Sequence, residues 1–344
     1  LKETYLLLHN MTLYIMVTLS ILFLTSCFGF TIEFPFGANF MTRIKNIDLT
    51  RITEQTKADL QYLFKTTPVL VFENQKITPE EQFFVCSLFD SNYTTQVLHP
   101  FSETAVPNTK QIAIRGKGIA NHFGVENVPI RNTRSFRYTP VWHQDLVGSK
   151  DVLPPIVSSM YMLKTPRYGG TTSFASMEGA YEAMSVEHRN ICSNLQCVYS
   201  SYHGLFGETD HTGYGRVDKY WRKELTPELS EQMVTQPMVI YPTSEDTKRT
   251  LMLSPNKVYK FQGGQGGVNP PNEKKKTRFI MKNYVLSPPG NVGTIKYRDN
   301  DLVIFNNRKV MHTSSPTEEY DECRYFALLF LGTTSPFLDS SLSF

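Results

Sequence analysis

Three side chains from two distant segments of the sequence could together bind a metal ion. His143 and Asp145 belong to the run Trp142-His143-Gln144-Asp145, and residues i and i+2 of an extended segment point to the same side. A third candidate ligand, His312, follows 169 residues after His143 (312 − 143 = 169). Two imidazoles and one carboxylate on one face of an octahedron leave three positions open, which is a ligand set of non-haem Fe(II).

An arginine and a threonine could complete such a site. Arg324 follows His312 by 12 residues (324 − 312 = 12) and opens the otherwise apolar strand 324–331. Because burying an unpaired guanidinium is costly, a dicarboxylate bound through a bidentate contact would suit it. Thr172 follows the Gly169-Gly170 turn, where the backbone can approach a ligand closely. Taken alone, however, the His-x-Asp run is typical of a hydrogen-bonded pair, Thr172 of an ordinary strand residue, and Arg324 of a strand edge that reaches water.

The first part of the chain predicts helices around a buried strand. Apolar residues recur at helical spacing within residues 58–64, and residues 68–72 have the composition of a short buried strand. The run Thr78-Pro79-Glu80-Glu81 combines an N-cap, a proline at the first helical position and a capping-box glutamate. We expect the helix that follows to bury Phe84, Val85, Leu88 and Phe89.

Beyond residue 130 the pattern changes to short strands separated by turn residues. Residues 157–164 have strand character, a second strand is predicted at residues 171–175, and Ser176 is expected to cap a helix that runs to Met184. Many short strands with few helices predict a mainly β fold with flanking helices, a sandwich or a jelly-roll barrel. Further strands are predicted at residues 238–241, 250–253, 294–297, 302–305 and 324–331.

Composition indicates a globular domain without a nucleic-acid partner. The 344 residues are 40% hydrophobic and 19% charged, and the net charge is +3 (35 − 32). The basic run Lys274-Lys275-Lys276 is interpreted as a solvated loop, and the glycine-rich residues 262–267 as a flexible loop or part of a lid. The five cysteines contain no Cys-x-x-Cys pair, which excludes a zinc knuckle, although Cys192 and Cys197 could be bridged in an oxidising compartment.

The N-terminal residues 1–31 are interpreted as a signal peptide or a short signal anchor. No charged residue occurs from Met11 to Thr31, and the apolar run there has the length of a signal h-region. A helix packed on the domain is the alternative. A signal would indicate a secretory or organellar route, and otherwise the protein is expected in the cytoplasm. One domain is predicted over residues 33–336, followed by a C-terminal tail at residues 337–344.

Taken together, these motifs resemble the taurine dioxygenase / TfdA family of Fe(II)- and 2-oxoglutarate-dependent dioxygenases. The resemblance implies a double-stranded β-helix (a cupin-like jelly roll) that uses Fe(II), 2-oxoglutarate and O2. It also implies that His143, Asp145 and His312 bind iron and that Arg324, assisted by Thr172, binds the distal carboxylate of 2-oxoglutarate. The matching pieces are residues 36–38, 47–49, 69–75, 77–82, 142–145, 169–172 and 301–305, followed by His312 and Arg324.

The departures from the family concern the substrate. Sulfonate-oxidising members have a second arginine four residues after the co-substrate arginine, and here that position is Leu328. Phe326 and Leu328 should point into the same cavity as Arg324. His99 and Phe101 resemble the family's substrate segment, although a loop histidine without a role is an equal alternative. Either of two further arginines, at positions 134 and 137, could replace the missing cation, or both could be surface charges.

The leading hypothesis is a dioxygenase that hydroxylates a small organic substrate while 2-oxoglutarate is decarboxylated to succinate and CO2. A catalytically silent jelly-roll binding protein is the first alternative, and the intact ligand set argues against it. A zinc-dependent hydrolase using the same three ligands is the second, but a dicarboxylate explains Arg324 and Thr172 better. A homo-oligomer is compatible with the sequence, and membrane contact is expected only through the N-terminal anchor.

Overall fold

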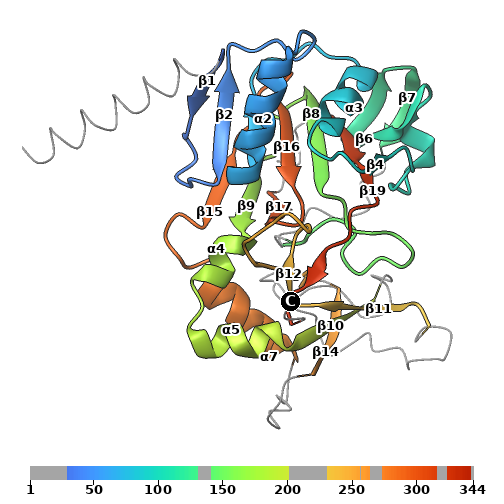
Figure 1. Cartoon of the computed structure of the whole chain (residues 1–344). Coiled ribbons are helices and arrows are strands. Elements are labelled where there is room, and N and C mark those ends of the chain that lie inside the picture. The colour runs from blue at the N-terminus through green and yellow to red at the C-terminus, as the bar shows by residue number, and fades with distance from the viewer. Residues whose placement is uncertain are drawn as a thin grey trace, which may run out of the picture.

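The computed structural model describes residues 29–130, 141–200, 231–255, 257–263, 273–315 and 324–341 (Figure 1). Most of the predicted signal or anchor segment and both alternative arginines lie outside these ranges, as do most of the glycine-rich loop and the last three residues of the tail. The interpretations made for those segments therefore stay predictions. Within the described residues, no helix combines the length and the apolar character that a membrane crossing requires.

A nine-stranded sheet forms the centre of the molecule. Its neighbouring strands run antiparallel, except for the parallel pair β2 and β3. The ninth strand, β7, forms an antiparallel hairpin with β6. The strand order is β1 (Thr31–Glu33), β2 (Met41–Lys45), β3 (Val69–Phe72), β16 (Leu302–Asn306), β8 (Val157–Lys164), β18 (Arg324–Phe330), β6 (Thr109–His122) and β5 (Ala105–Val106), with β7 (Val125–Ile130) paired to β6.

A smaller sheet packs face to face against this large one. It contains β15 (Val292–Ile295), β9 (Thr172–Ser176) and β17 (Val310–Ser314), all antiparallel. The core between the sheets takes side chains from both, including Met160 and Phe305 from the large sheet and Phe174 from the small one. The predicted mainly β fold with a jelly-roll core is confirmed.

Helices α2 (Glu54–Thr66) and α3 (Pro79–Ser87) pack with the core on the other face of the large sheet (Figure 1). The predicted capping box is confirmed, because the Thr78 hydroxyl accepts from Glu81 N and the Glu81 carboxylate accepts from Thr78 N. The prediction of which face of α3 is buried is wrong, because the buried face is rotated by part of a turn. Phe84 is 55% exposed, whereas Gln82 is buried and donates to Ser159 Oγ and to the main-chain oxygen of Ala327.

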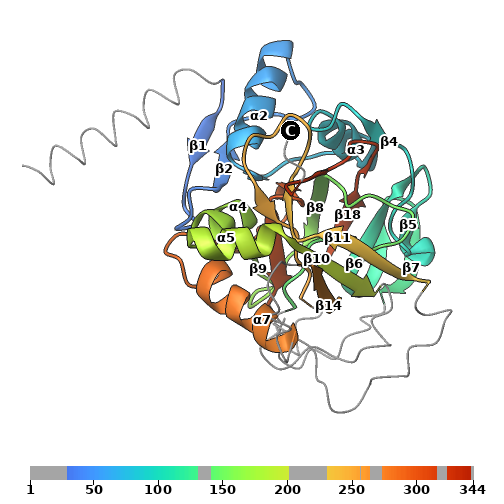
Figure 2. The same ribbon diagram turned by 60° about the horizontal axis from the view of Figure 1, so that its bottom comes forward.

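A third group of elements covers the outer face of the small sheet (Figure 2). Ser176 caps α4 as predicted, and Cys192 and Cys197 are both buried free thiols. The interpretation of Lys274-Lys275-Lys276 as a loop is wrong, because these residues lie in α7. The group contains α4 (Met177–Glu182), α5 (Val186–Ser193), α7 (Glu273–Ile280), a π-helical turn (Met281–Val285), β10 (Leu195–Ser200), β11 (Met233–Pro237), β12 (Val239–Tyr241), β13 (Thr250–Leu251), β14 (Val258–Gly263) and β20 (Leu338–Asp339).

Every strand predicted beyond residue 130 is present in the structure, within two residues at each end. The hairpin of β6 and β7 was not predicted. Gly116 and Gly118 interrupt β6, and both have positive φ, which obscures the alternating pattern of a strand. The remaining short elements are the paired strands β4 (Tyr93–Thr94) and β19 (Gly332–Thr333) and a 3-10 helix (Ser102–Thr104).

Candidate metal centre

His143, Asp145 and His312 converge on one point between the sheets. One ligand atom from each lies within 4.8 Å of the other two. Asp145 Oδ1 is 3.6 Å from His143 Nε2 and 3.7 Å from His312 Nε2. The side chains of Asp145 and His312 are 7% and 10% exposed, whereas that of His143 is 30% exposed, so the group is open to solvent on the His143 side.

Main-chain pairing brings these segments together. His312 lies in β17, where it pairs with Phe174 of β9. On its other side it forms an isolated antiparallel bridge with His143, through hydrogen bonds from His143 N to His312 O (3.0 Å) and from His312 N to His143 O (2.9 Å). The His312 ring is packed against Phe174 and Phe305, at centroid distances of 5.8 and 4.9 Å.

The protonation states suit a divalent metal ion. Burial lowers the pKa of His312 to about 4, assisted by His143 and opposed by Asp145, so its imidazole is neutral at neutral pH. Burial alone would raise the pKa of Asp145, but its interactions with His312, His143 and Ser158 outweigh burial, and the net shift is downward. Neutral imidazole and ionised carboxylate are the forms that bind metals.

Two further observations fit a bound ion. Asp145 Oδ2 is buried and has no hydrogen-bond partner among the described residues, which is costly for a carboxylate unless another group binds it. The His143 Nδ1 atom is 2.8 Å from the carbonyl oxygen of Val141, which assigns the proton to Nδ1 and leaves the Nε2 lone pair facing Asp145. Such a hydrogen bond from the second ring nitrogen to a carbonyl is typical of metal-binding histidines.

Gln144, between the two candidate ligands, anchors their segment and was not singled out from the sequence. It is fully buried, and its Nε2 donates to Asn307 O at 3.0 Å while its Oε1 accepts from Leu253 N at 2.8 Å. Its main-chain N donates to Ser254 Oγ at 3.0 Å. Because every partner is more than a hundred residues away, local sequence patterns carry no signal for this role.

The turn that follows Asp145 has unusual backbone geometry. Leu146 has φ 57° and Gly148 has φ 74°, both in the left-handed region. A Cβ on residue 148 would lie 2.3 Å from the Cβ of Tyr199, so only glycine fits there. Lys257 closes the turn by donating from Nζ to Val147 O at 3.1 Å.

The predicted co-substrate residues lie on strands of the two different sheets. Thr172 is buried at the start of β9 and pairs with Ser314 of β17, two residues beyond His312. Arg324 begins β18, where its main chain pairs with Lys117 of β6. The Arg324 side chain lies outside the described part of the structure, so its contact with 2-oxoglutarate stays a prediction.

The predicted substrate residues fall into two groups. Phe326 and Leu328 pack against the core between the sheets, the same core whose Phe174 and Phe305 contact the His312 ring. They therefore face the side of β18 on which the candidate metal centre lies.

His99 and Phe101 are stacked on each other, with ring centroids 5.8 Å apart. His99 is buried, its Nδ1 accepts from Phe101 N at 3.2 Å, and its Nε2 lies 2.8 Å from Lys110 O. The guanidinium of Arg115 lies over the Phe101 ring at 3.6 Å from the centroid. Both ring nitrogens of His99 thus have main-chain partners, and its substrate contact stays a prediction.

Residues 30–327 match the model of a known family, described as "Taurine catabolism dioxygenase TauD, TfdA family". The chain belongs to this family. Two relatives are the alpha-ketoglutarate-dependent xanthine dioxygenases of Emericella nidulans and Schizosaccharomyces pombe. The first is 25% identical over 324 residues, 78% of this chain and 86% of the relative, and the second is 23% identical over 351 residues, 85% and 84%.

Solved structures of TauD/TfdA-like proteins share the fold. A taurine dioxygenase from Burkholderia xenovorans superimposes with a TM-score of 0.63 at 18% identity, covering 90% of this chain and 92% of the other. AAD-2, solved with Mn(II) and N-oxalylglycine, gives a TM-score of 0.60 at 19% identity, covering 89% and 98%. The enzyme class predicted from the sequence, a 2-oxoglutarate-dependent dioxygenase, is confirmed by the family and these relatives.

Proposed function

We propose that His143, Asp145 and His312 hold Fe(II) and that the enzyme hydroxylates a small planar organic molecule at the expense of 2-oxoglutarate. The observation that carries this proposal is the convergence of three metal-binding atoms within 4.8 Å, drawn from segments 169 residues apart. The buried Asp145 Oδ2 atom, which has no hydrogen-bond partner among the described residues, supports the proposal.

Each ligand has a separate part in holding the ion. His312 is fixed by main-chain bonds on both sides and supplies a neutral imidazole. Asp145 supplies the charge that offsets part of the ion's own, and His143 supplies the solvent-facing imidazole. Iron held there would supply the chemistry that activates O2 and couples decarboxylation of the keto acid to hydroxylation.

Arg324 and Thr172 are proposed to hold the distal carboxylate of 2-oxoglutarate. Thr172 supports this role by its place, because it pairs with Ser314, two residues from His312 along β17. A guanidinium can meet a carboxylate with two parallel hydrogen bonds, and the threonine hydroxyl can donate a third. This arrangement would orient the keto acid group toward the ion.

Xanthine is the first substrate to test, because two curated relatives that match most of this chain are xanthine dioxygenases. Apolar side chains also favour an uncharged ring over a sulfonate. Phe326 and Leu328 pack against the core between the sheets, and Leu328 stands where sulfonate-oxidising members have a cation. An uncharged planar ring stacks on aromatic side chains and requires no buried counter-charge.

We expect the purified chain, supplied with Fe(II), ascorbate, O2 and 2-oxoglutarate, to release succinate faster when xanthine is added. Taurine should give no such stimulation, because Leu328 offers no cation for its sulfonate. The measurement is succinate formed per enzyme, with oxidised xanthine followed in parallel. If another compound stimulated succinate release instead, the proposed reaction would stand and the proposed substrate would be wrong. No succinate under any condition would refute the activity.

Replacing Arg324 by alanine should mainly raise the concentration of 2-oxoglutarate needed for half-maximal succinate release. Loss of a charge-assisted pair costs about 1.5–3 kcal/mol, which corresponds to roughly 10- to 150-fold. Metal content should stay at the wild-type level, because Arg324 is not a proposed ligand. Arg298→Ala, on an exposed side chain, is the control. An unchanged requirement for 2-oxoglutarate in the Arg324 variant would contradict the assignment.

A further inference from the structure

Asn307 contacts the candidate metal centre through the main chain of Asp145. It is fully buried in the turn between β16 and β17. Its Oδ1 accepts a hydrogen bond from Asp145 N at 2.6 Å, and its Nδ2 donates to Asp145 O at 2.9 Å. The same Nδ2 lies 3.3 Å from Pro155 O. A single side-chain amide therefore satisfies both main-chain groups of a candidate ligand.

These two hydrogen bonds hold the Asp145 backbone, as strand pairing holds the backbone of His143 and His312. His143 pairs with His312 by two main-chain hydrogen bonds, but the bridge is isolated and does not continue to Asp145. Leu146 then turns with a left-handed φ of 57°, so no regular strand can extend beyond Asp145. The Asn307 amide thus fixes the direction of the backbone at Asp145 itself, next to the segment that Gln144 anchors.

The turn that carries Asn307 is itself firmly held. Asn307 N donates to Ile156 O at 2.9 Å, and its own carbonyl accepts from Gln144. The next residue, Arg308, is fully buried and donates to three main-chain carbonyls.

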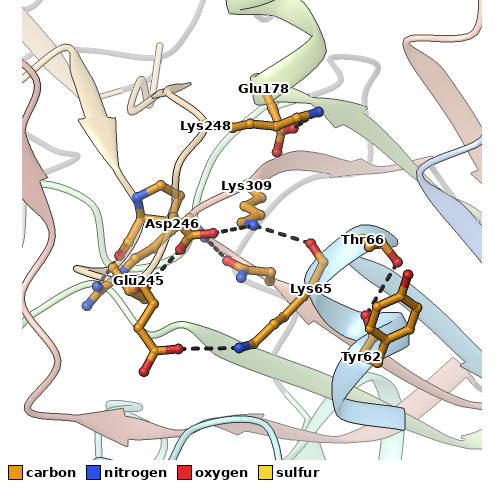
Figure 3. A network of polar contacts seen from close by, with 12 residues as sticks. Tyr62, Lys65, Thr66, Glu178, Glu245, Asp246, Lys248 and Lys309 are labelled. Atoms are coloured by element: carbon orange, nitrogen blue, oxygen red, sulfur yellow. Dashed lines mark hydrogen bonds and ion pairs between the residues drawn. The ribbon is translucent and has the colours of Figure 1, made fainter. Parts of the chain in front are cut away.

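Lys309 completes the turn. It is buried, pairs with Asp246 at 2.6 Å and approaches Lys65 O at 3.4 Å, as Figure 3 shows. A rigid support of this kind lets Asn307 transmit a fixed position to Asp145.

We propose that Asn307 is a positioning residue of the metal centre, which sets the Asp145 carboxylate relative to His312. The inference rests on the proposed metal-binding role of these residues. Asn307 and His312 stand five residues apart on either side of the start of β17, so one short segment carries one ligand and holds another. Removing the amide would keep all three proposed ligand side chains but let the Asp145 backbone move.

The test is direct metal binding by Asn307→Ala, titrated with Co(II) as an optical substitute for Fe(II) and without any substrate. We expect about 10- to 100-fold weaker binding, the range seen when an outer partner of a ligand is removed. Asn291→Ala is the matched control. Asn291 is also buried, and its Nδ2 donates to the carbonyls of Ser176 and Val285 at 3.0 and 2.7 Å, away from the proposed ligands.

The control should lose a similar amount of thermal stability and keep wild-type affinity for Co(II). Asn307→Asp gives a second test, because it keeps the side-chain shape but replaces the donor that faces Asp145 O. Wild-type affinity in either folded Asn307 variant, or equal weakening in Asn291→Ala, would overturn the inference. Failure of the wild-type chain to bind Co(II) would instead overturn the proposed function, so the two failures are distinguishable.

Discussion

Asp145→Ala is expected to abolish stoichiometric Fe(II) binding and, with it, succinate release. The variant removes the only anionic member of the cluster and leaves two imidazoles, one of them part-exposed. Loss of a direct ligand should exceed the roughly 100-fold effect of losing an outer partner. The measurement is metal per chain after equilibrium dialysis, together with succinate formed over a fixed time.

A second buried aspartate gives the matched control. Asp90 is also buried, and its Oδ1 accepts from Asn92 N at 3.0 Å, in a turn that has no part in the cluster. Asp90→Asn should therefore bind Fe(II) with wild-type stoichiometry and release succinate at the wild-type rate. If Asp145→Ala retained one tightly bound ion per chain, the carboxylate could not be a ligand, and the proposed centre would be wrong.

Arg308→Ala is expected to lower the free energy of unfolding by about 4 kcal/mol, because each buried carbonyl left without a donor costs about 1–3 kcal/mol. Its guanidinium donates to Pro154 O, Pro242 O and Ser335 O at 2.7–2.9 Å, and the variant leaves all three carbonyls without this donor. Burial lowers the pKa of Arg308 to about 10, so the side chain is still charged at neutral pH. Unfolding in urea, followed by fluorescence, measures the change.

Arg249 is the matched arginine for that experiment. Its guanidinium donates to the hydroxyls of Tyr241 and Tyr181 at 3.1 and 3.2 Å, and it is only half-buried. Arg249→Ala should cost no more than about 1.5 kcal/mol, because water can replace its contacts. If both variants lost the same free energy of unfolding, the three buried contacts of Arg308 would not stabilise the fold more than the part-buried contacts of Arg249.

Local signals predicted much of this fold correctly. The capping box of α3 is specified by four consecutive residues, and its geometry in the structure is the one that the sequence predicts. The strands near the site are short apolar runs bounded by turns, which is why β8, β9 and β16 were found with accurate bounds. The His-x-Asp spacing is local in the same sense, since two candidate ligands two residues apart need only an extended segment.

Some of the incorrect and missed predictions share a physical cause. Hydrophobicity assigned Phe84 to the core, but the inner position of α3 is taken by Gln82, whose amide binds groups 77 and 245 residues away. Gln144 and Asn307 likewise act through partners that no window of sequence contains. Polar residues that become buried are recognisable only when their hydrogen-bond partners are known, and those are set by the tertiary structure.

The single bridge between His143 and His312 has a consequence for how the enzyme matures. The proposed ligands come from two distant segments, and a nascent polypeptide that ends before residue 312 carries only two of the three. If these side chains hold iron as proposed, the site is complete only after residue 312 has been synthesised and β17 has docked. A bound ion would link the loop at residues 143–145 to the small sheet. Removing the ion with a chelator should therefore release this loop before either sheet is disturbed.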